Sequence, residues 1–272
     1  MPSSAPSASS PGLPPVPEAL RRRKRTVLLL YGGIALALAL SAGFTEANPL
    51  RLAESIGKSL AFSARFLPPS LDLLPQFLRS LGETIIMGFW GSVLATFLAV
   101  PLAFLGARNV VGGGAVYYLA RGAMDVLRGL NELVLALVFV AALGLGPLPG
   151  ILALTLHTAG VVGKLLSEAI ETVDPGQVEA VRATGAHPLA VILYGIWPQV
   201  APHFTSYTLY HFEVNVRSAT VLGLVGAGGI GFDLMQTVRS FRFQDAATVI
   251  LLIVAAVFVI DKLSARLRRA LV

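Results

Sequence analysis

Long apolar runs separated by short polar breaks dominate this chain of 272 residues. A helix needs about 20 mostly apolar residues to cross a bilayer, and six runs approach or exceed that length. They lie at 27–44, 83–107, 115–143, 148–170, 197–222 and 246–260. The pattern therefore predicts an all-α integral membrane protein with about six transmembrane helices.

The chain before the second run divides into two further segments. Residues 1–25 are rich in Ser, Pro and Ala and end in a run of five basic residues, so we expect a disordered cytoplasmic N-terminal tail. Residues 26–78 should hold the first transmembrane helix and an interfacial segment, because apolar positions in 48–77 share one helical face. A signal peptide is the alternative for 21–44, but no clear small-x-small cleavage site follows. Residues 79–272 then form the main membrane domain.

The fifth run is unusually polar for a transmembrane helix. Each charge at the centre of a lipid-facing helix costs roughly 2.5–3.5 kcal/mol, so this helix should face the protein interior or a water-filled path. The candidate path residues are His203, His211, Asn215 and Arg217. We expect Arg217 near the outer end of the helix. The alternative is a purely structural pair with Glu213, one helical turn earlier.

Glu132 opens the apolar core of the third run, where a carboxylate is costly unless it is paired or hydrated. One interpretation is that it reaches the lipid headgroups. The other is that it forms an internal pair with Lys164, Arg128 or Arg217 and contributes to the path.

A glycine-rich run follows the fifth apolar run. Its glycines are Gly226, Gly228, Gly229 and Gly231, and they match G-x-G-x-x-G after a strand-like stretch at 219–225. A dinucleotide site would need a parallel-sheet unit and an acidic residue about 20 positions on, which this sequence lacks. A sharp turn within the membrane fits better. The turn either acts as a gate or substrate contact through its N–H groups or binds nothing.

A polar interruption at 179–198 separates the fourth and fifth runs. It predicts a short helix at the membrane surface, entered through Asp174-Pro175-Gly176 and ended by Gly185. Small Ala and Gly side chains leave a shallow surface on which another protein can dock. The candidate docking residues in the loop 174–188 are Glu179, Ala180, Arg182 and Gly185.

Composition narrows the function classes. Only 13% of residues are charged, against about a quarter in soluble domains. The net charge of +6 comes largely from the N-terminal basic run, which is typical of a cytoplasmic chain end and not of nucleic-acid binding. The chain has no cysteine, its four His lack metal-ligand spacing, and Gly163-Lys164 is only a fragment of a P-loop. We therefore expect no metal, no ATP site and no cofactor.

The polar interruption resembles the EAA loop of ABC-importer permeases. The matching positions are Glu179, Ala180, Gly185 and Pro198, whereas Val181 replaces an Ala and Gly195 stands where Ile is usual. The resemblance implies a type I ABC-importer permease fold for 79–272. It also implies that the loop 174–188 is a coupling helix on the cytoplasmic side, docked on an ATP-binding subunit.

Further runs are similar to one branch of these importers, the phosphonate-uptake permeases. They lie at 81–84, 101–109, 128–137, 144–147, 157–168 and, most specifically, at 212–231, which includes Glu213-x-Asn215-x-Arg217. The resemblance implies a non-enzymatic permease subunit of the cell inner membrane that imports phosphonates, phosphite or phosphate esters. The implied partners are two copies of an ATP-binding subunit, a periplasmic phosphonate-binding protein and a second copy of this chain. The alternatives are a methionine or metal-chelate importer and a membrane anchor or sensor.

Overall fold

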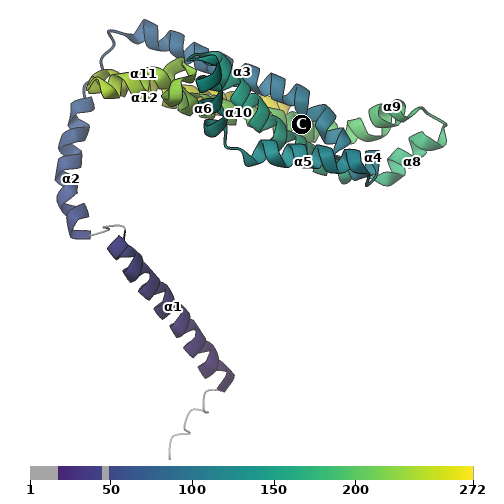
Figure 1. Cartoon of the computed structure of the whole chain (residues 1–272), viewed down its shortest axis with the longest axis horizontal. Coiled ribbons are helices and arrows are strands. Elements are labelled where there is room, and N and C mark those ends of the chain that lie inside the picture. The colour runs from purple at the N-terminus through teal and green to yellow at the C-terminus, as the bar shows by residue number, and fades with distance from the viewer. Residues whose placement is uncertain (1–17, 45–48, 272) are drawn as a thin grey trace, which may run out of the picture. The chain divides into compact units, whose positions relative to one another are not determined.

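The structure is a computed structural model that describes residues 18–44 and 49–271. Every regular element in the described part is helical, as the sequence predicts (Figure 1). The chain forms two units, residues 1–63 and 64–272, which are taken here one at a time. The predicted disorder of residues 1–17 lies outside the described residues.

The first unit contains two helices, α1 (Glu18–Phe44) and α2 (Pro49–Ser63). Helix α1 begins ahead of the predicted first span and includes the basic run at 21–25, where the sequence predicts disorder. Arg and Lys are good helix formers, and their charge does not end a helix. Within the described residues, the apolar part of α1, Thr26–Leu38, is shorter than a full span.

The second unit begins with a 3-10 turn, η1 (Ala64–Phe66), and a long helix, α3 (Leu74–Leu105). Pro75 lies in the first turn of α3, where its missing N–H and fixed φ are tolerated. The second span therefore begins earlier than predicted, and Pro75 starts it instead of breaking the segment before it. Pro101 lies inside α3, as the sequence predicts.

Short connections join the remaining helices. In chain order these are α4 (Arg108–Val111), α5 (Ala115–Gly129), α6 (Glu132–Leu143), α7 (Pro147–Glu171), α8 (Pro175–Ala183), α9 (Pro188–Val191), the π-helical turn η2 (Ile192–Ile196), α10 (Trp197–Leu222), the π-helical turn η3 (Gly223–Ala227), α11 (Gly229–Arg239) and α12 (Phe243–Leu271). Helices α3 and α7 pack along each other, and α10 packs against both. Helices α5 and α6 cover α7, and α11 and α12 contact α3 and α10.

Three helices in the described chain, α3, α7 and α12, are long and apolar enough to cross a membrane, and two bent pairs raise the number to five. One bent pair is α5–α6, with an angle of 85°, so the segment predicted as the third span is not one straight helix. The break comes at Asn131, whose Oδ1 accepts a hydrogen bond from Leu133 N at 2.8 Å and caps the start of α6. The other pair is α10–α11, bent by 57°. The strand-like stretch at 219–225 is helical too, as the end of α10 and part of η3.

The second unit has two different ends (Figure 1). At the α8 end, α8 and α9 extend beyond the other helices, and buried Val178 of α8 packs in one apolar cluster with Ile170 of α7. At the α11 end lie α11 and the starts of α3 and α12, where Phe77, Ile230 and Val249 form a separate cluster.

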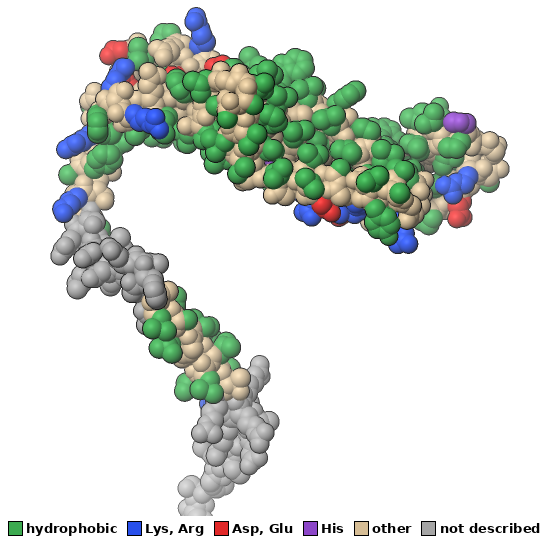
Figure 2. Space-filling model, viewed as in Figure 1, with side chains coloured by type: hydrophobic (Ala, Val, Ile, Leu, Met, Phe, Trp, Pro, Cys, Tyr) green, Lys and Arg blue, Asp and Glu red, His purple; other side chains and the backbone are tan. Residues whose placement is uncertain are grey.

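Large apolar side chains are exposed along α3 and α12 between these two ends. They include Phe89, Trp90 and Phe97 on α3 and Leu251 and Phe258 on α12. Apolar side chains cover much of the face seen in Figure 2. Soluble monomers rarely expose apolar patches of this extent, so this belt is the surface that faces lipid.

Candidate functional site

The short helix α8 is fixed to α10 by a few specific contacts. Asp174 caps α8 by accepting a hydrogen bond from Gly176 N at 2.9 Å, and its own N–H donates to Gln199 Oε1 at 2.9 Å. Gly195, which departs from the usual EAA pattern, is buried beside α8, and an added Cβ would lie 3.3 Å from Val178 Cα. The small residue therefore lets the start of the fifth span approach the backbone of α8.

The exposed surface of α8 and of the turn that follows it carries the four predicted docking residues. Glu179, Ala180, Arg182 and Gly185 are all exposed. Gly185 has φ +77°, the left-handed conformation that ends many helices, and it follows α8 as predicted. Neither Glu179 nor Arg182 has an ion-pair partner within the described residues. Their charged side chains, and the exposed backbone around them, are therefore free to contact a partner protein.

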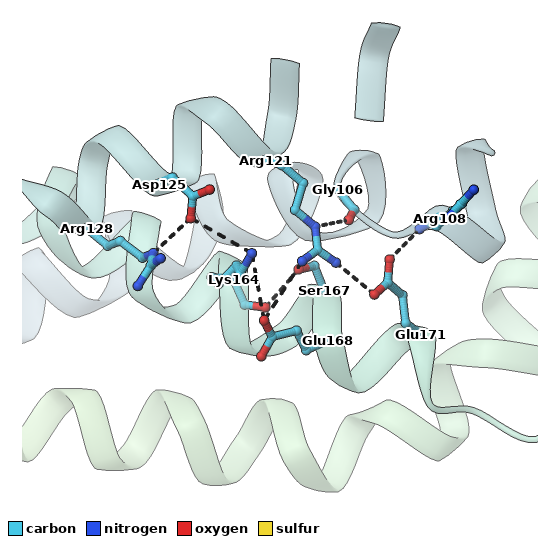
Figure 3. Close-up of polar contacts among 9 residues, drawn as sticks. All are labelled: Gly106, Arg108, Arg121, Asp125, Arg128, Lys164, Ser167, Glu168 and Glu171. Atoms are coloured by element: carbon cyan, nitrogen blue, oxygen red, sulfur yellow. Dashed lines mark hydrogen bonds and ion pairs between the residues drawn. The ribbon is translucent and has the colours of Figure 1, made fainter. Parts of the chain in front are cut away.

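A network of charged side chains joins α5 to α7 next to α8 (Figure 3). Arg121 lies 2.8 Å from Glu171 and 3.8 Å from Glu168, and its Nε donates to Gly106 O at 2.8 Å. Lys164 lies 3.9 Å from Asp125 and 3.8 Å from Glu168. Asp125 also accepts from Arg128 Nε at 3.0 Å. These contacts couple the end of α7, which leads directly into α8, to the neighbouring helix.

Sequence reasoning missed this network, although a signal was present. Charged residues recur at 121, 125 and 128 on α5 and at 164, 168 and 171 on α7, with the same spacing of four and then three. That spacing places each set on one helical face. Two such faces of mixed charge in neighbouring apolar helices predict contact with each other, because unpaired charges at membrane depth are costly.

Asn215, a predicted path residue, lies at the centre of a buried polar group instead of on an open surface. Its Nδ2 donates to Ser92 Oγ at 2.9 Å, and its Oδ1 accepts from Thr158 Oγ1 at 2.8 Å. Ser92 in turn donates to Gly88 O at 2.7 Å. The amide therefore fastens α3, α7 and α10 together, and its hydrogen-bonding groups are engaged in this conformation.

Glu132 has partners that the sequence did not suggest. Ser218 Oγ donates to Glu132 Oε1 at 3.1 Å, and His157 Nε2 lies 3.6 Å from Glu132 Oε2. The predicted alternatives of Lys164, Arg128 or Arg217 are wrong, because Lys164 and Arg128 belong to the charged network farther along α7 and α5, and Arg217 pairs elsewhere. Glu132 thus links α6, α7 and α10 at the break between α5 and α6.

Arg217 does not pair with Glu213. Arg217 Nη2 lies 3.5 Å from Asp261 Oδ1, whereas Glu213 is held by Arg268 at 2.8 Å. Arg217 lies near the C-terminal end of α10, from which the chain goes on through η3 into α11, and its position relative to the outer face stays a prediction. Counted from its start at Phe243, α12 reaches Asp261 only after its apolar part. Arg217, which contacts Asp261, therefore lies level with the end of that apolar part.

Three exposed polar residues form a stripe along α10. His203, Tyr210 and Arg217 are each exposed and recur every seven residues, which places them on one face of the helix. We call these three the α10 stripe. His211, the fourth path candidate, is buried and meets the ring of Tyr210 edge-on at 5.3 Å. No group of three His, Cys, Asp or Glu among the described residues is arranged to hold a metal ion.

The glycine run forms the bend between α10 and α11. Gly226, Gly228 and Gly229 have φ of +99°, +80° and +68°, which L side chains rarely adopt. Gly231 is buried, and a Cβ added to it would collide with the backbone carbonyl of Thr220. The absence of a side chain therefore lets α10 and α11 pack closely there.

Side chains from α3 hold the first N–H groups of α11. Gly229 N donates to Glu83 Oε2 at 3.2 Å, and Ile230 N donates to Thr84 Oγ1 at 2.9 Å. The carboxylate satisfies donors that a helix N-terminus leaves free and complements its dipole. The N–H groups of this turn were considered as a contact for the substrate. In this conformation the chain's own Glu83 occupies that position.

Residues 95–272 match the family model described as "Binding-protein-dependent transport system inner membrane component". The chain is 38% identical over 248 residues to the phosphite transport system permease protein PtxC of Stutzerimonas stutzeri, covering 91% of this chain and 89% of the relative. It is 57% identical over 118 residues to the putative cryptic phosphonate transport system permease protein PhnE2 of Escherichia coli (strain K12), covering 43% of this chain and 97% of the relative.

A solved structure of the MetNI methionine ABC transporter in inward-facing conformations is similar in fold. It has a TM-score of 0.66 and 21% sequence identity, covering 75% of this chain and 99% of that chain. Identity this low shows the fold alone. The prediction of an all-α, type I ABC-importer permease fold is confirmed.

Proposed function

Because this chain belongs to the family of binding-protein-dependent transport system inner membrane components, we propose that it forms the membrane path of an ABC importer for phosphonates, phosphite or phosphate esters. The observation that carries the substrate class is sequence identity. It is 38% to a permease named for phosphite and 57% to one named for phosphonate, against 21% to the methionine transporter structure.

The chain is a multi-pass protein of the inner membrane. Under this proposal it pairs with a second copy of itself, binds two copies of an ATP-binding subunit and receives substrate from a periplasmic phosphonate-binding protein. The N-terminus and the α8 end face the cytoplasm. ATP hydrolysis takes place in the ATP-binding subunit, so the permease itself is not an enzyme and needs no cofactor.

Helix α8 is the element that receives force from the ATP-binding subunit. Its exposed face, with Glu179, Ala180, Arg182 and the turn at Gly185, docks in that subunit. Movement of α8 passes to α7 through the short link at Asp174 and to α5 through the charged network of Figure 3. Packed helices then rock as bodies between two arrangements, as alternating access requires.

The α10 stripe lines the path of the substrate. A phosphonate is a hydrated anion, so its path needs positive potential without a tight trap. Arg217 supplies a cation, and His203 and Tyr210 supply groups that can donate hydrogen bonds. A second copy of the chain that faces the stripe would shield it from lipid, where an exposed Arg is costly.

The bend at Gly226, Gly228, Gly229 and Gly231 serves as the gate, and Glu132, His211 and Asn215 hold α10 in place beside it.

Reconstitution tests this function. The permease, its ATP-binding subunit and its phosphonate-binding protein are placed in liposomes, and accumulation of methylphosphonate, phosphite and D-methionine is measured with and without ATP. We expect ATP-dependent uptake of the two phosphorus compounds and none of methionine. Methionine uptake would support the alternative importer. A folded permease that binds no ATP-binding subunit would support a membrane anchor or sensor.

A further inference from the structure

A polar cavity lies at the α11 end, opposite α8. Its volume is about 290 Å³, and its walls come from the start of α3 and from α11 with the loop that follows. Gln76, Gln236, Ser240 and Arg242 form an exposed rim, while Phe77, Thr237 and Asp233 are buried. The walls are thus built from two helices that the apolar cluster of Phe77, Ile230 and Val249 already holds together.

Asp233 is the unusual member of this cavity. The residue is only 6% exposed. The Oδ2 atom of its carboxylate is inaccessible to solvent and has no hydrogen-bond partner. No donor among the described residues reaches its other carboxylate oxygen, and no ion pair includes it. Arg242, the nearby cation on the rim, is already paired with Asp245 at 2.5 Å. A buried carboxylate is costly unless it is paired and hydrogen-bonded, so Asp233 offers an unmet acceptor to a donor from outside the chain, whether a water molecule or a side chain.

The chemistry of the cavity excludes the substrate and favours a single cationic side chain. An unpaired carboxylate repels a phosphonate anion. One carboxylate does not make a metal site, and the described residues contain no metal-binding cluster. The volume lies at or below the small end of the usual range for small-molecule pockets, about 300 Å³ and upwards. The end of a Lys or Arg side chain fits both the size and the charge.

The loop beside the cavity exposes an aromatic side chain at a conformational cost. Phe241 has φ +57°, the only positive φ of a non-glycine residue in the described chain, and its side chain is 78% exposed. It ends α11 where Gly is usual, with Arg242 N donating to Thr237 O at 2.9 Å. A bulky residue in this conformation is strained, and such strain clusters at functional sites. Exposed aromatic residues are common anchors at protein interfaces.

We propose that the Asp233 cavity receives a basic side chain of the substrate-binding protein, with Phe241 as an apolar contact at its edge. The inference rests on the proposed function, in which a binding protein delivers substrate to the face opposite the ATP-binding subunit. The family description makes a binding protein the partner of this class of membrane component. The α11 end is the end away from α8 (Figure 1), and charge complementarity selects the side chain that enters.

The test measures the affinity of the binding protein for the whole complex in lipid nanodiscs, with wild type, Asp233→Asn and Asp72→Asn permeases. Asp72 is an exposed carboxylate at the same end that accepts a hydrogen bond from Ser70 Oγ at 3.3 Å, so it controls for loss of a surface charge. Asp233→Asn should weaken binding by at least about tenfold, because loss of one partner of a buried charge pair is costly. Asp72→Asn should change it by about twofold or less. At saturating binding protein, stimulated ATPase activity should be the same in all three.

A second measurement does not depend on how Asp233→Asn folds. The chain has no cysteine, so Ser240→Cys places the only permease thiol on the rim of the cavity. A short maleimide–succinimide cross-linker should join it to a Lys of the binding protein. Equal affinity of wild type and Asp233→Asn, or no cross-link despite normal binding, overturns this inference and leaves the proposed function intact. A change in ATPase activity caused by Asp233→Asn also overturns it if the change is equally large without binding protein and depends on the content of phosphatidylethanolamine. The cavity would then hold the amine of a lipid headgroup. Failure of the wild type to bind any binding protein overturns the proposed function itself.

Discussion

Two charged residues one turn apart on α10 have different surroundings. The Glu213 side chain is only 14% exposed and is held by Arg268 at 2.8 Å. The Arg217 side chain is 57% exposed and approaches Asp261 only to 3.5 Å. An exposed pair of this kind contributes about 0–1 kcal/mol to stability. The fold therefore depends little on the charge of Arg217, which remains available to a substrate anion.

We expect Arg217→Gln to lower phosphonate uptake by about tenfold, with little change in the melting temperature of the purified permease. A charge-assisted hydrogen bond contributes roughly 1.5–3 kcal/mol, and 1.4 kcal/mol corresponds to a factor of ten. Uptake and basal ATPase activity in liposomes, together with thermal unfolding, measure the two effects separately.

Asp261→Asn is the matched control, because it breaks the same pair and keeps the cation of Arg217. Uptake by this variant should stay close to wild type. If the two variants lose uptake equally, or if Arg217→Gln transports normally, Arg217 has a structural role and does not line the path.

At the scale of elements, helices bounded by local signals could be predicted, and breaks set by tertiary contacts could not. The predicted range 197–222 is the observed range of α10, which has Pro198 in its first turn and is followed by a glycine run that breaks the helical path at Gly226, where φ is +99°. The break before Glu132 was missed, because one Asn in an apolar run is also compatible with a straight helix. Docking residues on α8 could be placed from local sequence, although their role stays a prediction.

The partners of the charged groups were harder to predict than the helices. Glu132 meets Ser218, 86 positions away, and Arg217 meets Asp261, 44 positions away. Nothing in a single sequence specifies such pairs, because they depend on which helix faces pack together. Helix α5 illustrates the consequence: the spacing of its charges places them on one face, but it does not say that this face joins α5 to the helix that leads into α8 (Figure 3).

We expect Arg121→Gln to uncouple ATP hydrolysis from transport. The Arg121 side chain is only 14% exposed and is the one that bridges α5 to Glu171 at the end of α7. Substitutions along a coupling network change coupling by about 0.5–2 kcal/mol, so uptake per ATP hydrolysed should fall roughly 2- to 30-fold. The ratio of the two rates in liposomes measures this. Arg128→Gln, at a 48% exposed member of the same network, should have a clearly smaller effect. Equal ratios in wild type and Arg121→Gln would show that force does not pass through this contact.

At the scale of the whole molecule, the second unit has different chemistry at its two ends and an apolar belt between them. The α8 end has an exposed short helix backed by paired charges, and the α11 end has an unpaired carboxylate beside an exposed Phe241. The apolar side chains of α3 and α12 lie between them, and apolar side chains cover much of the face seen in Figure 2. Such a division suits a protein that is driven from one side of a membrane and loaded from the other.

Single-cysteine labelling tests the central claim that the α8 end lies in the cytoplasm and docks on the ATP-binding subunit. Because the chain has no cysteine of its own, Ala180→Cys and Ser240→Cys each introduce one thiol at an exposed position of the two ends. A membrane-impermeant maleimide should label Cys at 180 only in inside-out vesicles, and bound ATP-binding subunit should protect it. Position 240 should react only in right-side-out vesicles. Labelling of position 180 from the outside, or no protection by the ATP-binding subunit, would contradict the account.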